Sequence, residues 1–342
     1  MDPTGKSQAP LRLNVRGTLL AATAMLALAC PAASQANTGA VAALNAQIAA
    51  RGVWGNTSSN TPTVFQAGAS PCVQKVAVRS STSWPDLAAK WSAVPLPCYH
   101  QPSSGTDEEE VLLTPDHTYE FWGMEWNSAP FSNIWSARWG GGEPNSAFTQ
   151  YVGGIRAWPN TIARYGGQAS GIALYPGIIT VHDLQQGHID HAVEIDVVYA
   201  CWTTRFPATG SDGLNTANCL QYGTLFKLPA SVDCNGLGLY RVARMVCGAA
   251  QRYGLIVADQ SHDRVTFRFE NWKRKWASWS PDGSMVDPYT DLNQRSRGLD
   301  FFGCDGYTNG VPKPPGQEWD CYPSEKGVFR NFPWSQLVEA NG

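Results

Sequence analysis

Residues 111–126 read VLLTPDHTYEFWGMEW, and this stretch decides the fold class that we predict. Two runs rich in aliphatic, β-branched and aromatic residues, Val111–Leu113 and Thr118–Trp126, flank a short turn. The pattern predicts a β-hairpin. Because successive side chains of a strand point to opposite faces, Glu120 and Trp122 should share one face of the second strand.

Similar runs recur further along the chain. Ala192–Tyr199 is a predicted strand with Glu194 and Asp196 on one face, and Gly254–Asp259 is another. Between them, Leu237–Tyr253 has apolar residues at helical spacing and is the one predicted packed helix. A short helix is also predicted in the Ala-rich residues 37–51, and one helical turn at 181–187.

The composition agrees with a chain that is mainly β. It has 33 Gly, 23 Pro and 14 Trp, and only 15% of its residues are charged. The last strand is predicted at Val328–Phe332, after a Pro-, Gly- and Asp-rich loop at Ser280–Glu325. No internal repeat or domain linker divides the chain, so we expect one domain.

Several motifs together resemble a family of uncharacterised secreted bacterial proteins with a jelly-roll-type β core. They occur in the same order as in that family, at Tyr119–Trp122, Ala169–Ile172, Pro176–Ile179, Gly187–Ala192 and Arg252–Asp259. The resemblance implies export and a jelly-roll-type core. With the composition it leads us to expect a single-domain jelly-roll or β-sandwich with one packed helix and long disulfide-stapled loops. It implies no particular reaction.

The N-terminus has the pattern of a secretory signal peptide. Basic residues precede an apolar run, Gly17–Cys30, and small residues follow at Ser34 and Ala36. We therefore predict that 1–36 is a signal peptide, that 37–342 is the single β-sandwich domain, and that the protein is secreted and extracellular. A periplasmic location is an alternative.

The cysteine count supports export. The chain has nine Cys, and removal of the leader with Cys30 leaves eight, an even number typical of disulfides in exported proteins. The eight fall into sequence-local pairs, which we predict to be Cys72–Cys98, Cys201–Cys219, Cys234–Cys247 and Cys304–Cys321. A lipid anchor on Cys30, which follows a sequence loosely resembling a lipobox, is an alternative.

The charge argues against a nucleic-acid partner. The formal net charge is −3, and removal of three basic residues and Asp2 with the leader changes it to −5. Phosphate contacts need clustered Lys and Arg. The one such cluster, 273–275, is more simply a solvated edge. No segment after the leader is long and apolar enough to span a membrane.

Carboxylates are the candidates for catalysis, because the chain lacks a serine-hydrolase elbow, an HExxH zinc motif and nucleotide fingerprints. Glycoside hydrolysis needs two carboxyl groups, one protonated and one ionised. Glu120 and Glu194 lie in predicted strands with aromatic or apolar neighbours, which can raise a carboxyl pKa. His191 is a candidate base for a lyase-type proton abstraction. The simpler alternative is that all three are structural.

Candidate substrate-binding residues are Tyr119, Trp122, Trp126 and Asp259. Aromatic rings stack on pyranose rings, and Asp259 ends a buried-looking strand where its carboxylate could line a cleft, although it could equally cap a turn. We predict no cofactor. A divalent metal at His188 and His191 is the alternative, but strand alternation points His191 away from Glu194.

These observations favour a secreted carbohydrate-active protein that cleaves a polysaccharide or oligosaccharide in an aromatic-lined cleft, as a glycoside hydrolase or a lyase. The alternatives are a lectin-like binding protein without a reaction and a structural envelope protein. An enzyme should bring two acidic or histidine groups together in one cleft, whereas a lectin should show an aromatic platform without them.

Overall fold

The structure is a computed structural model of the chain. It describes residues 39–57, 59–68, 71–79, 86–145, 166–261, 263–272, 307–308, 311–312 and 327–340. All of them belong to one compact unit, Asn37–Gly342. They are mainly β, arranged in several sheets, and the described residues include four α-helices.

The first of two main sheets has six strands. Their order is β1 (Val53–Asn56), β16 (Val265–Arg268), β11 (Val193–Val197), β15 (Leu255–Gln260), β14 (Leu225–Lys227) and β19 (Val338–Glu339). The pairs β1–β16 and β11–β15 are parallel, and the other three pairs are antiparallel. The sheet is therefore mixed.

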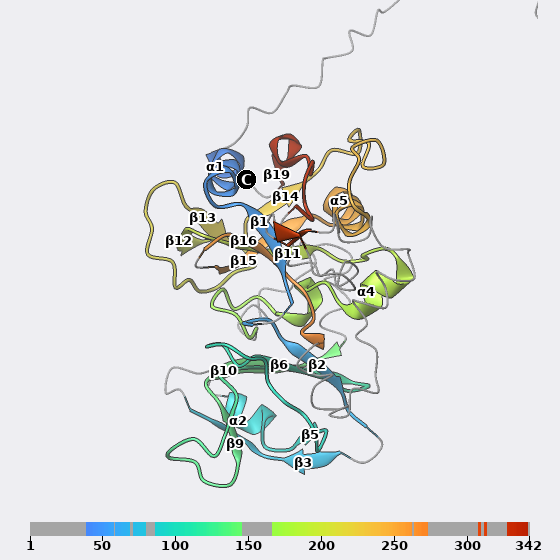
Figure 1. Cartoon of the computed structure of the whole chain (residues 1–342). Coiled ribbons are helices and arrows are strands. Elements are labelled where there is room, and N and C mark those ends of the chain that lie inside the picture. The colour runs from blue at the N-terminus through green and yellow to red at the C-terminus, as the bar shows by residue number, and fades with distance from the viewer. Residues whose placement is uncertain are drawn as a thin grey trace, which may run out of the picture. The chain divides into compact units, whose positions relative to one another are not determined.

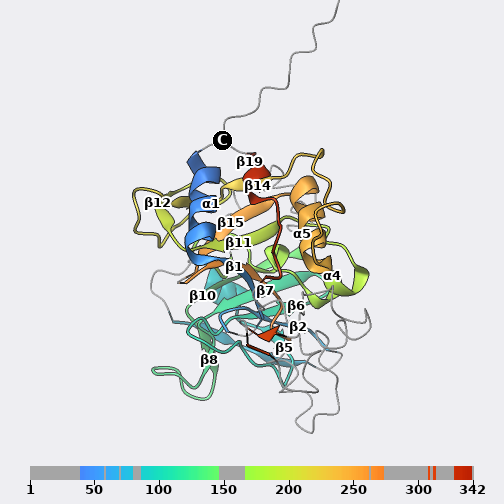
Figure 2. The same cartoon turned by 45° about the horizontal axis from the view of Figure 1, so that its top comes forward.

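One face of this sheet is apolar and is covered by helices. Figures 1 and 2 show α1 (Gly39–Arg51) and α5 (Arg241–Arg252) over it, with the C-terminal segment between the two helices. Phe267 on β16 is fully buried there, with its ring 4.4 Å from that of Phe329 and 6.0 Å from that of Trp334. Burial of such side chains, each worth about 1.5–3 kcal/mol, holds this layer together.

The opposite face of the same strands is polar. Strand alternation turns Thr266 and Arg268 away from the helices, and Asp196 on β11 pairs with Thr266 across the sheet. In Figure 1 this face looks toward the second main sheet. The alternation thus places charged side chains between the two sheets.

The second main sheet has four strands. Their order is β10 (Trp139–Pro144), β7 (His117–Trp122), β6 (Glu110–Leu113) and β2 (Thr63–Gln66). β6 and β7 form the predicted antiparallel hairpin, which is confirmed. β10 pairs with β7 in the same sheet and approaches it closely at Gly140. The φ angle of Gly140 is +143°, and a Cβ atom there would lie 1.9 Å from the carbonyl oxygen of Glu120. Only glycine fits that position.

Shorter elements complete the fold. The strands are β3 (Cys72–Gln74), β4 (Val76–Val78), β5 (Val94–Leu96), β8 (Glu125–Trp126), β9 (Trp135–Ala137), β12 (Ala200–Thr204), β13 (Leu220–Tyr222), β17 (Tyr307–Thr308) and β18 (Val311–Pro312). The helical elements are α2 (Leu87–Lys90), α4 (Val181–Gln186), η3 (Tyr175–Gly177) and η4 (Trp334–Gln336). Under the second sheet, Trp91 and Phe121 are fully buried with ring centroids 4.9 Å apart.

Three predicted disulfides are confirmed: Cys72–Cys98, Cys201–Cys219 and Cys234–Cys247. The fourth, Cys304–Cys321, lies outside the described residues, as does the predicted signal peptide at 1–36. Within the described part of the chain, no helix is long and apolar enough to cross a membrane.

Other expectations need correction. A jelly-roll topology is not confirmed, because the six-stranded sheet contains two parallel pairs. The predicted packed helix begins at Arg241 rather than Leu237, while the short helix predicted in 37–51 and the helical turn predicted at 181–187 are confirmed as α1 and α4. Val328–Phe332 forms turns instead of the last strand, because Phe329 packs on Phe267, and Phe332 on Trp334, rather than alternating along a sheet.

Candidate functional site

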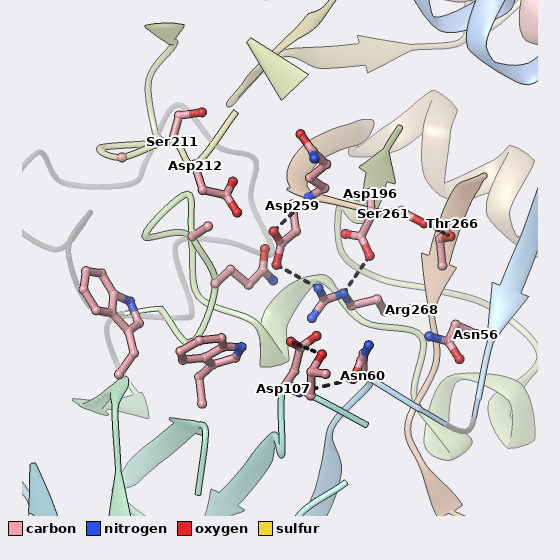
Figure 3. A pocket seen from close by; sticks show the side chains of 18 of the residues that line it. Asn56, Asn60, Asp107, Asp196, Ser211, Asp212, Asp259, Ser261, Thr266 and Arg268 are labelled. Carbon is pink, nitrogen blue, oxygen red and sulfur yellow. Dashed lines mark hydrogen bonds and ion pairs between the residues drawn. The ribbon is translucent and has the colours of Figure 1, made fainter. Parts of the chain in front are cut away.

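A pocket of about 710 Å³ is lined by residues of both main sheets (Figure 3). Three indole rings contribute to it: Trp54 from β1, Trp122 from β7 and Trp139 from β10. The side-chain amides of Asn56 and Asn60 lie along the same lining. Its volume is within the range of small-molecule sites, and its mix of aromatic and polar groups is typical of them.

The charged groups of the lining are mostly acidic. The lining contains five carboxyl side chains and one basic side chain: Asp107, Asp196, Asp212, Asp259, Asp263 and Arg268. They come from separate elements, since Asp196 lies on β11, Asp259 on β15 and Arg268 on β16. Adjacency of these strands in the sheet brings the three together.

Arg268 is the centre of this charge cluster. Its guanidinium is buried and donates through Nε to Asp196 (2.8 Å), through Nη1 to Glu109 (2.6 Å) and through Nη2 to Asp259 (2.8 Å). A fourth carboxyl, that of Glu194, lies 3.9 Å from Nε. Figure 3 shows the bonds to Asp196 and Asp259. One arginine therefore serves four acidic groups.

This imbalance changes the protonation of the carboxyl groups. Burial raises the pKa of Glu109 to about 7, although the charge of Arg268 opposes the rise. Burial also raises the pKa of Asp196, and raises those of Glu194 and Asp259 well above the usual range. One cation cannot offset four desolvated anions, so some of these groups keep their protons near neutral pH.

Asp259 and Asp212 face one another across the pocket (Figure 3). Asp259 accepts hydrogen bonds from Arg268 and from the backbone N–H of Gln260, 2.8 Å away. Asp212, in the loop after β12, accepts a hydrogen bond of 2.6 Å from the Tyr222 hydroxyl. Both carboxyl groups are thus held in place, and the charge of Asp212 contributes to the raised pKa of Asp259.

Glu194 does not line the pocket but lies behind it. It is fully buried and accepts a hydrogen bond from the side-chain Nε2 of Gln168. Gln168 does line the pocket, and its Oε1 has no hydrogen-bond partner. Glu194 therefore orients a residue of the lining rather than contacting a ligand itself.

Glu120 also lies outside the lining. Its Oε2 accepts hydrogen bonds from the backbone N–H groups of Gly167 and Leu174 (2.9 Å each), and its Oε1 accepts one from Tyr175 (2.8 Å). Burial raises its pKa to about 7, and these three bonds act against the rise. The predicted catalytic carboxyl fastens the segment that carries Gln168 to β7.

His191 is hydrogen-bonded away from the pocket. Its Nε2 lies 3.3 Å from Asp183 and its Nδ1 lies 2.9 Å from the carbonyl oxygen of Ala192. Asp183 forms a capping box with Thr180 at the start of α4. The structure therefore does not bring His191 together with Glu120 and Glu194 in one cleft.

The predicted binding residues divide into two groups. Trp122 and Asp259 line the pocket, whereas Tyr119 and Trp126 do not. The ring of Tyr119 stacks on that of His117 with centroids 6.0 Å apart, because Tyr119 points to the other face of β7 from Trp122. Trp126 is about half exposed at 51%.

His188 and His191, the alternative ligands for a divalent metal, pair with different carboxyl groups. His188 is exposed and pairs with Asp190 at 2.9 Å, apart from the His191–Asp183 pair. In the described residues, no set of three or more His, Cys, Asp or Glu side chains could hold a metal ion.

The central residues Arg268, Glu109 and Asp212 were not among the sequence candidates. A signal for Arg268 existed in the alternation of residues 265–270, VTFRFE, which places an arginine on the face opposite two phenylalanines. Asp196, on the polar face of the predicted strand at 192–199, was a possible ion-pair partner for Arg268. No local pattern pointed to Asp212, which lies in a loop.

Comparison of the chain with models of protein families, with curated proteins and with solved structures finds no match.

Proposed function

We propose that the protein is an exported carbohydrate-active enzyme that hydrolyses a glycosidic bond in the pocket at Arg268. The observation that carries the proposal is the pair Asp212 and Asp259, which face one pocket from different elements (Figure 3). Three tryptophans contribute to the lining of the same pocket. Paired carboxyl groups and aromatic rings are what glycoside hydrolysis requires.

The two carboxyl groups have different surroundings, which supports different roles. Burial raises the pKa of Asp259 well above its usual range, so it can carry a proton and donate it to the glycosidic oxygen as that C–O bond breaks. Asp212 then takes a proton from the water that bonds to the anomeric carbon, or attacks that carbon directly. Tyr222 and Arg268 are positioning residues for Asp212 and Asp259.

Export is part of the same proposal. Three disulfides are typical of proteins that fold in an oxidising compartment. They support the prediction that 1–36 is a signal peptide and that the protein acts outside the cytoplasm.

A lectin-like protein without a reaction is the second candidate. Both oxygens of Asp259 already accept hydrogen bonds, from Arg268 and from the backbone of Gln260, and such occupancy favours a structural role for that carboxyl. The two candidates share the pocket and its ligand class, and they differ only in whether a bond is broken.

Release of reducing ends from a panel of neutral, amino and acidic polysaccharides tests the proposal. Asp259→Asn and Asp212→Asn keep the size of each side chain and should each lower the rate by at least about a hundredfold, as expected on loss of a general acid or base. Asp233→Asn, at an exposed carboxyl outside the pocket, is the matched control and should leave the rate unchanged.

Activity that survives in both pocket variants would overturn the assignment. Binding of a glycan without release of ends by the parent protein would instead favour the lectin-like alternative.

A further inference from the structure

The charge of the pocket is one-sided. Its lining contains five aspartates and one basic side chain, Arg268, which already donates to Glu109, Asp196 and Asp259. Asp263 pairs with Arg264, which leaves Asp107 and Asp212 without a basic partner in the lining. No lysine or histidine occurs among the described residues of the lining. An anionic ligand would therefore meet like charge in the lining, whereas a cation beside an ionised carboxylate is attracted.

Two buried acceptors of the lining lack donors. Gln168 is 1% exposed and Asp196 is 4% exposed, yet Gln168 Oε1 and Asp196 Oδ1 have no hydrogen-bond partner. An unpaired buried acceptor is unfavourable, and a ligand that brings N–H or O–H groups to it removes that cost. An ammonium group fits this need, because it has three donors and no acceptor.

The aromatic rings of the lining are also suited to cations. The guanidinium of Arg264 lies 4.3 Å from the ring centroid of Trp54, and that of Arg138 lies 5.8 Å from that of Trp122. Two of the three indoles thus already hold a positive charge within cation–π distance. Neither arginine is part of the pocket lining.

We infer that the glycan bound by this pocket carries free primary amines, as in oligomers of glucosamine. This inference rests on the proposed function, since it names the sugar class for the same pocket. The sugar rings stack on the indoles, and the ammonium groups face Asp107, Asp212 and the unpaired oxygens of Gln168 and Asp196.

A sugar is favoured over a basic peptide by the rest of the lining. Hydroxyl and amide side chains surround the carboxylates, among them Asn56, Thr209, Ser211 and Ser261. These groups both donate and accept, as the hydroxyl groups of a sugar do, whereas a lysine side chain offers only a methylene stem and its ammonium.

Calorimetric titration of the purified protein tests the inference. The probes are glucosamine tetramers, the same tetramers N-acetylated, galacturonate tetramers and tetralysine. The glucosamine tetramer should bind at least about tenfold more tightly than its acetylated form at low salt, and this preference should shrink in about 0.5 M NaCl because exposed charges are screened. Asp107→Asn should reduce the preference several-fold, while Asp233→Asn should preserve it.

Equal or tighter binding of the acetylated tetramer, of galacturonate or of tetralysine would overturn the inference. Its failure can be told apart from that of the proposed function. Selective binding without bond cleavage keeps the amine inference and removes the hydrolase, whereas cleavage of a neutral glycan that binds better than its amino counterpart does the reverse.

Discussion

Replacement of Arg268 by methionine should destabilise the fold, and it should do so more strongly near pH 7.5 than near pH 5. Methionine has a similar length but no charge. It removes the guanidinium donor from Glu109, Asp196 and Asp259. Removal of one partner of a buried ion pair costs about 3–5 kcal/mol.

The pH dependence follows from how the variant can relieve that cost. A buried carboxylate without a cation takes up a proton, which costs about 1.4 kcal/mol for each unit by which the pH exceeds its ordinary pKa. Each carboxyl that is ionised in the parent therefore adds about 4–5 kcal/mol near pH 7.5 and about 1–2 kcal/mol near pH 5. The raised pKa of Glu109, about 7, means that at pH 5 the parent already carries that proton.

Urea unfolding under non-reducing conditions, followed by tryptophan fluorescence at both pH values, measures the difference. Arg264→Met is the control, since Arg264 pairs with the exposed Asp263 just before the same strand. It should cost under about 1 kcal/mol at either pH. An Arg268→Met variant with the same loss at both pH values would refute the reasoning, because protonation would then play no part.

Three further predictions concern stability. Glu120→Gln should lower the free energy of chemical unfolding by about 2 kcal/mol. The N–H₂ group of the new glutamine would face a backbone N–H group that now donates a hydrogen bond to the Glu120 carboxyl. Unchanged stability would mean that the three backbone hydrogen bonds to Glu120 contribute nothing. Glu109 and Glu120 have a pKa of about 7 in the folded protein, against 4.5 for an ordinary glutamate. The stability that comes from protonation of these two groups is therefore complete below pH 4.5 and is lost as the pH rises toward 7, by about 3 kcal/mol for each group. Unfolding free energies that rise over this interval would contradict that assignment. Gly140→Ala should destabilise the fold by about 3 kcal/mol or more, because the new methyl group would contact the Glu120 carbonyl oxygen. Gly248→Ala, in α5 with open space around it, should stabilise the fold by up to about 1 kcal/mol. Thermal unfolding measures both, and a change of the same sign in the two variants would rule out the steric argument.

Local patterns predicted the elements of the fold better than their assembly. The hairpin at 111–126 and the strands in 192–199 and 254–259 follow from alternation and side-chain type, and three disulfides follow from the short spacing of their cysteines. Strand order and direction did not follow, because β1 pairs in parallel with β16 more than two hundred residues later. No periodicity in either segment specifies such a partner.

The site was predicted only in part, for a similar reason. Trp122 and Asp259 were recognised, since aromatic and acidic residues in strands point to a lined cleft. Glu120 and Glu194 were chosen because burial raises a carboxyl pKa, and burial is indeed present. The same burial, however, withdraws them from the pocket and engages them with Gly167 and Gln168. A sequence pattern can indicate that a carboxyl group is buried, but it does not identify the groups that form hydrogen bonds with it.

The four carboxyl groups around Arg268 also bind protons that a ligand can displace. A cation that enters beside Asp196 takes over the neutralising role of the proton on that carboxyl group, and so releases the proton to the solvent. By linkage, affinity for such a ligand must then rise with pH across the range in which the groups titrate. The surroundings of the protein, and not only the concentration of its ligand, would set how fully the pocket is occupied.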